Sequence, residues 1–554
     1  MQGRFDQGMS NGASIGRLGL PARWRGSTAA GDIPPYSFGP TEQPTFEGGP
    51  FSPAHHPARR IAYLVVALVV GIAAQLGNAL ITVNLLNIAG SMGVTLSDAT
   101  WLSSMFVAAN ASANLLLIRG RIRFGIPLIT HTLLLAYAAA TVVQLTMPGF
   151  HTALLVRVAS GAVATALSTI TVYCMLQVVS PRARPLALLI AISISQLAVP
   201  IARLFPVTML TIGEWQGLHL VELGITLTVI AALAAVPLPP SIRGPGFEPL
   251  DFLTFALVFP GMILLCGSLG AGRYLWWTDT PWIGWALAGS LILFTLAFLV
   301  EHHRSRPLLL TRWIGSADML RFAAVALLVR FALAEQTYGA VGLLASGGLN
   351  NDQMHTLFLI VLAAMVCGIL VACLTLRPNG IPYQVMAAAL IIAAGAWFDT
   401  YSTNLTRPQQ LYVSQALLGF GACLFVGPAV LFGFARVLQL GQNYLISFLV
   451  LFAVSQNVGG LLGSAVLGSY QVMRTRAHAE ALSEHLLASD PMVAARLAQQ
   501  GNAGLYAAVQ REAAILAFND VFQLVAVIAL MTALYVGFLI VRNRIRAKRV
   551  AAGE

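Results

Sequence analysis

Charged residues are scarce in this sequence, and lysine is almost missing from it. Only 10% of the 554 residues are charged, whereas a soluble domain has about 25%. Hydrophobic residues make up 57% of the chain, and the mean hydropathy is +0.77. The net charge of +11 comes from arginine, because Lys548 is the single lysine. These proportions exclude an ordinary soluble protein and indicate an integral membrane protein.

Motifs that hold metals or reactive groups are also missing. Neither CxxC nor HExxH occurs, and no phosphate-binding loop or nucleophile–base spacing is present. The five cysteines lie in apolar stretches, as small buried hydrophobes do: Cys174, Cys266, Cys367, Cys373 and Cys423. We therefore expect no metal, no cofactor and no enzymatic activity.

Long apolar stretches are abundant. A membrane helix needs about 20 apolar residues, and fourteen stretches of this kind follow residue 58. They lie near 61–83, 99–118, 126–146, 150–173, 184–207, 217–237, 251–270, 281–300, 320–343, 355–375, 382–399, 409–433, 443–467 and 519–541. Residues 1–58 are rich in Gly, Pro and Ser, and we predict a disordered cytoplasmic tail there. The fold class is thus an all-α polytopic membrane protein.

The arginines indicate the orientation of these helices. They concentrate in alternate short loops, beginning with the N-terminal segment and ending with the basic tail 546–554. Positive residues mark cytoplasmic loops, so we expect both termini in the cytoplasm. The same distribution explains the basic charge without nucleic acid as a partner.

One long connection, residues 468–518, is polar and rich in helix formers. Asp490 followed by Pro491 predicts a helix start, and Gly501 predicts the end of that helix. On the proposed topology this segment is external. It is either a docking surface or a solvated spacer.

Arg157 lies inside the apolar stretch 150–184, where an arginine costs about 2.5–3.5 kcal/mol. Small residues, Gly161 among them, follow it at spacings of three and four, which lets another helix approach closely. The arginine therefore faces a partner or a watery cavity, or else it bonds to carbonyls at a helix end.

Three pieces of sequence resemble a known family. They are VNLLNIAGSMGVTLSDATWLSS (83–104), LLVRVASGAVA (154–164) and NVGGLLGSAVL (457–467). They are similar to the fourteen-span drug:proton antiporters of the major facilitator superfamily, nearest to the Emr-type inner-membrane pumps of tripartite efflux systems. The residues that match as structural motif positions are Trp101, Gly161, Pro200, Gly459 and Gly460.

The resemblance implies a major facilitator fold with 14 transmembrane helices. Two six-helix bundles would span 59–237 and 319–545, and 238–318 would hold two inserted helices and a linker. A cavity between the bundles would carry small apolar or amphipathic compounds outward against protons. The expected location is the bacterial inner membrane, with 468–518 engaging a periplasmic adaptor protein and, through it, an outer-membrane channel.

The first span departs from the family pattern. The family usually has an aspartate there, followed five residues later by an asparagine, and these positions hold Gly77 and Thr82. Proton coupling therefore needs another acid.

Glu335 is the clearest intramembrane acid, and we expect it to carry the proton. Arg330 lies five residues earlier, about 140° away around a helix, so the two are poorly placed to pair. By depth, we predict that Glu335 pairs with Arg157, directly or through water. The alternative is a Glu335 that is simply hydrated.

Other polar residues are candidates for the substrate cavity or for helix-to-helix bonds: Asn78, Gln196, Gln336, Tyr338 and Gln415. Glu222 and Asp399 fall near external helix ends, where we expect them to be solvated.

Three functions remain open at this point. The first is a proton-coupled exporter of apolar or amphipathic compounds. The second is an uncoupled facilitator or a specific metabolite exporter, which the missing first-span acid favours. The third is a non-transporting membrane scaffold that presents residues 468–518 to a partner.

Overall fold

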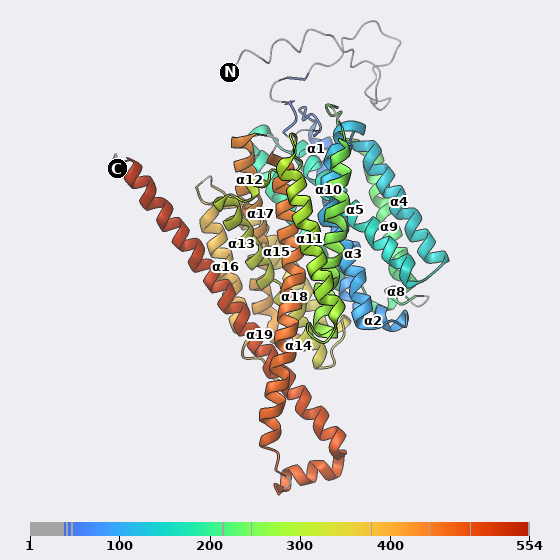
Figure 1. Cartoon of the computed structure of the whole chain (residues 1–554), viewed down its shortest axis with the longest axis vertical. Coiled ribbons are helices and arrows are strands. Elements are labelled where there is room, and N and C mark those ends of the chain that lie inside the picture. Colours follow the sequence, from blue (N-terminus) through green and yellow to red (C-terminus); the bar gives the residue numbers. More distant parts are fainter. Residues whose placement is uncertain are drawn as a thin grey trace.

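The structure, a computed structural model, describes residues 38–39, 42–45, 48–212, 215–244, 246–377, 379–441, 444–487 and 489–551. Within these residues, 13 helices are long and apolar enough to cross a membrane. A broken helix over 317–346 makes a further crossing. These 13 helices and the broken one give the 14 of the predicted all-α membrane fold, which is confirmed. Figure 1 shows their arrangement. Residues 1–37 of the predicted tail lie outside the described residues.

The N-terminal half contains six crossings. They are α1 (Pro57–Val83), α3 (Leu96–Phe124), α4 (Ile126–Thr146), α5 (Phe150–Val178), the stacked pair α6 (Arg184–Ile194) and α7 (Ala198–Arg203), and α9 (Gln216–Ala235). Helix ends coincide with residues that favour them. Thr95 caps the start of α3 by accepting a bond from the amide of Asp98 (3.2 Å), and Gly125, at φ +88°, ends it.

The C-terminal half also contains six crossings. The first is interrupted: α13 (Ala317–Ala332) leads into a single π-helical turn, Glu335–Gly339, and then into α14 (Ala340–Ser346). The others are α15 (His355–Leu374), α16 (Ile381–Asp399), α17 (Tyr412–Leu440), α18 (Leu445–Glu484) and α19 (Pro491–Ala551). Single π-helical turns occur frequently at functional sites, so this break identifies a segment to examine.

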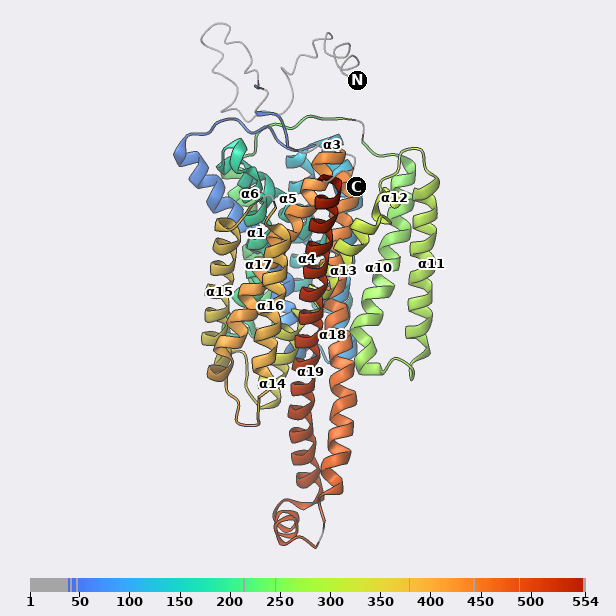
Figure 2. The same cartoon turned by 90° about the vertical axis from the view of Figure 1, so that its left-hand side faces the viewer.

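The two inserted helices, α10 (Pro249–Leu275) and α11 (Pro281–His303), form a hairpin at one edge of the molecule (Figure 2). The predicted motif residue Trp101 anchors them, because its ring fills the space beside Gly267 of α10. One helix end is tied by Arg304, whose guanidinium lies 2.5 Å from Asp251 and 3.2 Å from Glu301. The hairpin therefore packs against the outside of α3.

Helices α18 and α19 extend beyond the others at the end away from the termini (Figure 1). Asp490 accepts a bond from the amide of Met492 (2.8 Å), and Gly501 interrupts α19 with φ +68°. These are the residues at which the sequence predicts the start and the end of a helix. At the base of the extension, Arg474 Nε lies 2.5 Å from Asp520 Oδ2 and joins the two helices.

The segment just before α1 is docked, although the sequence predicts disorder there. His55 is 8% exposed, and its Nε2 lies 2.8 Å from Gln177 Oε1 of α5. Burial lowers the pKa of His55 below its usual 6.5, with Arg59 adding to the shift and the Gln177 bond opposing it.

This docking should weaken at acidic pH. Because the folded state holds His55 neutral, its contribution to docking is present above about pH 6.5 and decreases as the pH falls toward the lowered pKa. Hydrogen exchange, corrected for its intrinsic pH dependence, should show residues 51–56 less protected at pH 5 than at pH 7.5. In His55→Gln this pH difference should disappear; a difference that persists there would exclude His55 as its cause.

Gly161 lets α5 approach α3 closely. A Cβ at this position would lie 2.8 Å from the Ala109 Cβ and 3.0 Å from the amide of Asn110. We expect Gly161→Ala to destabilise the protein by about 1–3 kcal/mol, because both neighbours are backbone or backbone-proximal atoms that cannot yield. Unfolding of the detergent-solubilised protein measures this. Gly224→Ala, which meets nothing within 4 Å, is the control and should not destabilise.

Candidate functional site

A cavity of about 400 Å³ lies between the two halves. Helices α1, α3, α5 and α6–α7 form one wall, and α13, the π-helical turn, α17 and α18 form the other. Pro200 contributes to the first wall. Eight carboxamide side chains line the cavity: Gln75, Asn78, Asn110, Asn114, Gln196, Gln336, Gln456 and Asn457.

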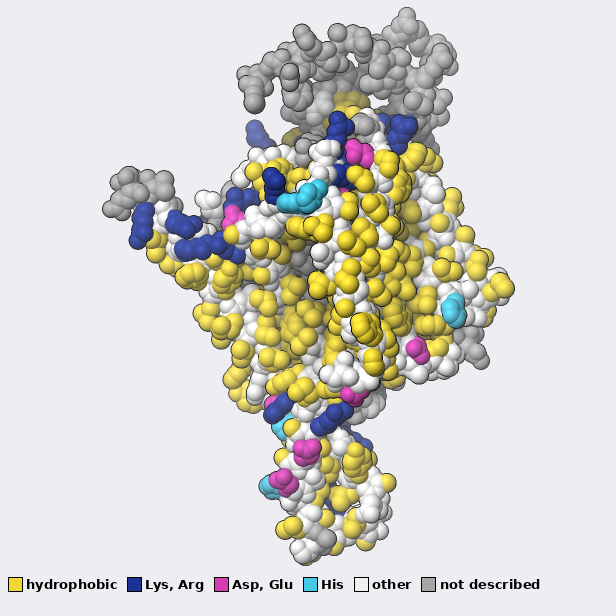
Figure 3. All heavy atoms as spheres, viewed as in Figure 1, with side chains coloured by type: hydrophobic (Ala, Val, Ile, Leu, Met, Phe, Trp, Pro, Cys, Tyr) yellow, Lys and Arg dark blue, Asp and Glu magenta, His cyan; other side chains and the backbone are white. Residues whose placement is uncertain are grey.

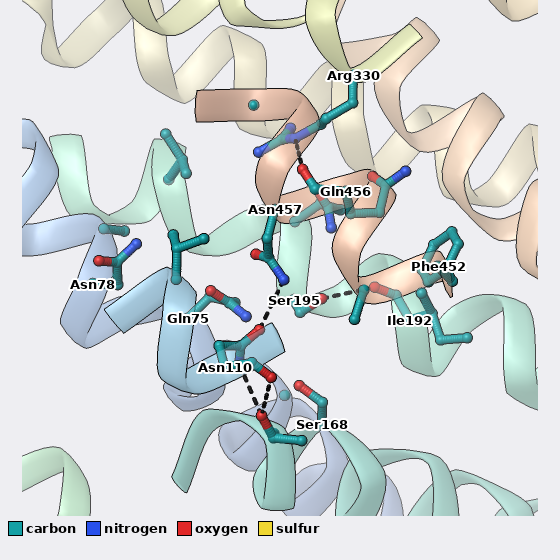
Figure 4. A pocket seen from close by; sticks show the side chains of 18 of the residues that line it. Gln75, Asn78, Asn110, Ser168, Ile192, Ser195, Arg330, Phe452, Gln456 and Asn457 are labelled. Carbon is teal, nitrogen blue, oxygen red and sulfur yellow. Dashed lines mark hydrogen bonds between the residues drawn. The ribbon is translucent and has the colours of Figure 1, made fainter. Parts of the chain in front are cut away.

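These amides meet across the cavity. Asn457 of α18 donates a hydrogen bond to Asn110 of α3 (2.9 Å), as Figure 4 shows. Of the predicted cavity residues, Asn78, Gln196 and Gln336 are in this set. The cavity can therefore bind polar groups of a ligand at many positions and orient them by hydrogen bonds.

Two of the predicted cavity residues, Tyr338 and Gln415, are not among the residues that line it. The ring of Tyr338 packs instead under the guanidinium of Arg273, 4.7 Å away. This contact lies beside Gly468 of α18. Its hydroxyl donates to Gln471 (3.4 Å). The amide of Gln415 lies in the core of the C-terminal half.

Arg330 faces the cavity from α13. Its Nε donates to the carbonyl of Gln456 on α18 (3.3 Å; Figure 4). The predicted motif residues Gly459 and Gly460 give it room, because a Cβ on Gly459 would lie 3.2 Å from the Arg330 Cβ and one on Gly460 3.3 Å from its Nε. As the helical spacing predicts, Arg330 forms no ion pair with Glu335 among the described contacts.

The end of the cavity away from the termini is closed by a contact between the halves. Arg203, at the end of α7, donates to the side chain of Asn351 (3.3 Å), and Asn351 donates back to the carbonyl of Arg203 (3.1 Å). The Arg203 guanidinium also lies 5.3 Å from the centre of the Phe358 ring. Beside them, the amide of Val207 donates to Asp352 (3.1 Å).

The prediction that Arg157 pairs with Glu335 is wrong. Arg157 Nη2 lies 2.5 Å from Glu222 Oε1 of α9, and both side chains are 0% exposed. His219 Nδ1 lies 3.0 Å from the other Glu222 oxygen. Arg157 also donates to the carbonyl of Gly77 (3.4 Å), which lies inside α1 rather than at a helix end. Its charge is therefore compensated within the N-terminal half, away from Glu335.

The Glu222 carboxylate lies beside Gly77 of α1. A Cβ on Gly77 would lie 3.1 Å from Glu222 Oε1 and 3.2 Å from the Tyr137 hydroxyl. Glu222 is 1% exposed, so the expected solvation was wrong. The carboxylate comes from α9 instead of α1, and Gly77 provides the space for it.

Glu335 lies with a second acid in the core of the C-terminal half. Gln415 Nε2 lies 3.2 Å from Glu335 Oε1 and 2.7 Å from Asp399 Oδ2. The side-chain nitrogen of Gln415 thus joins the two carboxyl groups. Glu335 is 0% exposed and Asp399 1%, so neither is hydrated and the expected solvation of Asp399 was wrong.

This acid pair differs from the Arg157–Glu222 pair in its charge balance. Among the described residues, no arginine, lysine or histidine is paired with Glu335 or Asp399. Two buried carboxylates without a cation cannot both be ionised. The acid pair therefore differs from Arg157–Glu222 in having no cation among its described partners.

The acid pair lies directly behind the cavity wall. Ala334, Gln336 and Thr337, on either side of Glu335, line the cavity. Glu335 begins the π-helical turn, where the regular helical register is interrupted. A small change in this turn could expose the carboxyl group to the cavity.

Among the described residues, no group of three or more His, Cys, Asp or Glu is placed to hold a metal ion.

Two six-crossing halves around a central cavity define the major facilitator fold. Solved structures share it with this chain. The human organic anion transporter MFSD10 (TETRAN) is 14% identical with a TM-score of 0.50, and the match covers 86% of this chain and 100% of that one. A bacterial homologue of the human drug peptide transporters PepT1 and PepT2 is 11% identical with a TM-score of 0.54, covering 88% and 99%. The sequence matches no protein-family model and no curated protein.

Proposed function

We propose that this protein is a secondary active exporter that moves small apolar or amphipathic compounds outward in exchange for protons. The observation that carries the proposal is the cavity of about 400 Å³ between the two halves, lined by both amides and apolar side chains. A cavity of this volume suits a drug-sized ligand. Rocking of the halves about it would give alternating access.

Proton coupling is assigned to the acid pair Glu335 and Asp399. Glu222 is a poorer candidate, because Arg157 compensates its charge at 2.5 Å and keeps it ionised. The acid pair has no such cation, so gaining or losing a proton changes its net charge in a buried site. Substrate in the cavity would alter the π-helical turn that holds Glu335 and so release the proton.

The extension of α18 and α19 is proposed to contact a periplasmic adaptor that leads to an outer-membrane channel, in a bacterial inner membrane with cytoplasmic termini. Large apolar side chains are exposed along it, at 55% for Met473, 62% for Leu487, 73% for Met492 and 66% for Tyr506. Arginines gather at the opposite end, on the tail of α19 (Figure 3), where the cytoplasmic face is expected.

Purified protein in liposomes loaded with a pH-sensitive dye tests the proposal. Addition of compounds from a panel of apolar and amphipathic molecules should produce proton flux that empty liposomes lack. Movement of a compound without proton flux would make the protein a facilitator. If no compound moves, the scaffold interpretation replaces transport. Deletion of residues 486–503 should then abolish binding of the partner protein.

A further inference from the structure

The charged side chains that line the cavity among the described residues are all positive. Three arginines line it, Arg121, Arg203 and Arg330, whereas none of its described lining residues is Asp, Glu, Lys or His. Each of the three donates to a group of the protein. Arg203 holds Asn351 at the closed end, and Arg121 donates to the carbonyl of Leu117 (3.2 Å) on its own helix.

Arg330 differs because no aromatic ring packs on its guanidinium among the described contacts, whereas Arg121 lies over Tyr173 (5.8 Å) and Arg203 over Phe358. A guanidinium has five N–H donors, and the described contacts use only Nε, which bonds to the Gln456 carbonyl. None of the described carboxylates is within ion-pair distance of it. In contrast, Arg157 is fully buried against Glu222 at 2.5 Å. A guanidinium held in a low-dielectric site without a counter-charge favours binding of an anion.

Two side-chain amides belong to Gln456, whose carbonyl Arg330 binds, and to its neighbour Asn457 on α18. The Gln456 side-chain nitrogen is buried and has no described partner. Asn457, on the adjacent position of α18, projects into the cavity toward Asn110 (Figure 4). One guanidinium and neighbouring amide donors are the set that recognises a carboxylate or sulfonate.

An apolar wall continues from this polar site toward the end that carries the termini. Leu445, Leu449 and Phe452 line the cavity on the same helix, α18. At 1.5 Å per residue, Leu445 lies about 16 Å along the helix from Gln456. The cavity is thus apolar along this stretch, and Arg330 lines it beyond the apolar side chains.

We propose that the transported compound is an amphipathic organic anion. Its carboxylate or sulfonate binds the Arg330 guanidinium, and its hydrophobic body lies along Leu445, Leu449 and Phe452. This inference rests on the proposed function, because it names the substrate class of that same cavity. It assigns Arg330 to substrate recognition rather than to the proton site, which Glu335 and Asp399 form.

Binding of three compounds that differ only in the head group tests the inference. The full chain in nanodiscs of uncharged lipid is titrated at pH 7.5 with 4-butylbenzoate, 4-butylbenzyl alcohol and 4-butylbenzylamine, with empty nanodiscs as the blank. The benzoate should bind at least about tenfold more tightly than the alcohol, because a charge-assisted bond to a guanidinium is stronger than a neutral one by about this factor. The amine should bind most weakly, because its positive charge is repelled by the guanidinium.

Arg330→Gln should weaken benzoate binding by roughly 10- to 100-fold and leave the alcohol unchanged. Arg321→Gln removes the same charge from the half-exposed start of α13 and should change neither. Equal binding of benzoate and alcohol by the unmodified protein would overturn the anion inference, even if Arg330→Gln folds poorly.

The outcomes also separate this inference from the proposed function. If all three compounds bind and are moved in liposomes without preference for the anion, the exporter stands and the anion inference fails. If none binds and none is moved, both fail. Preference for the benzoate that survives Arg330→Gln would assign the anion to another group and overturn the role of Arg330.

Discussion

Replacement of Glu335 by glutamine is expected to reduce compound-driven proton flux by roughly two orders of magnitude. Glutamine has the shape of the carboxylic acid and can keep the bond to Gln415, but it cannot gain or lose a proton. Glu335 begins the π-helical turn that forms part of the cavity wall, and it is the member of the acid pair nearest to the cavity residues. The measurement is dye-reported proton flux in liposomes.

Exchange of labelled for unlabelled compound provides the internal control for Glu335→Gln. Exchange requires binding and rocking of the halves but no net proton movement, so it should persist. Asp279→Asn removes an exposed acid from the turn between α10 and α11 and should leave the flux intact. Undiminished flux in Glu335→Gln would move the proton site elsewhere, with Glu222 the next buried carboxylate to test.

The membrane helices could be predicted from the sequence because their signal is local. A stretch of about 20 apolar residues has few alternatives to a membrane helix, and the crossing predicted at 126–146 has the bounds of α4. The start and the break of the external helix could be predicted for the same reason, because they depend on single residues. Asp490 lies at the helix start and Gly501 at the break. Glu335 is a functional candidate from the sequence alone, because an acid inside such a stretch is rare.

The partners of the buried charges could not be predicted, because counting residues gives depth along a helix but not its neighbours. Arg157 and Glu335 were matched by depth, yet they belong to different halves and pair within them. The sequence did contain one usable signal: His219 lies three residues before Glu222, a spacing at which side chains on a helix meet.

Burial near helix ends was missed for a related reason. Glu222 and Asp399 lie close to the ends of apolar stretches, where the bilayer alone would leave them in water. Packing covers them instead. Arg157 of α5 and the part of α1 around Gly77 lie against Glu222, and the start of α17 brings Gln415 over Asp399. Solvation in a polytopic protein depends on these connections, which the apolar pattern does not encode.

Loss of Arg157 is expected to destabilise the protein by about 3–5 kcal/mol. Arg157→Met keeps much of the volume but leaves the Glu222 carboxyl group buried without its arginine, so that it must either stay charged or take up a proton at a cost. A buried charge without its partner is far more costly than the pair is favourable. The free energy of unfolding in mixed detergent, and the yield of folded protein, measure the effect.

The double variant Arg157→Met, Glu222→Leu decides whether this destabilisation comes from the orphaned charge. Replacing both partners by apolar side chains removes the uncompensated carboxylate, so stability should return to within about 1–2 kcal/mol of the unmodified protein. Arg321→Met, at the half-exposed start of α13, controls for loss of an arginine and should have little effect. If the double variant is as unstable as Arg157→Met alone, the arginine stabilises the fold through packing and its bond to Gly77 rather than through its charge. Recovery of stability in the double variant, together with retained proton flux, would identify the Arg157–Glu222 pair as structural and leave Glu335 and Asp399 as the site that carries the proton.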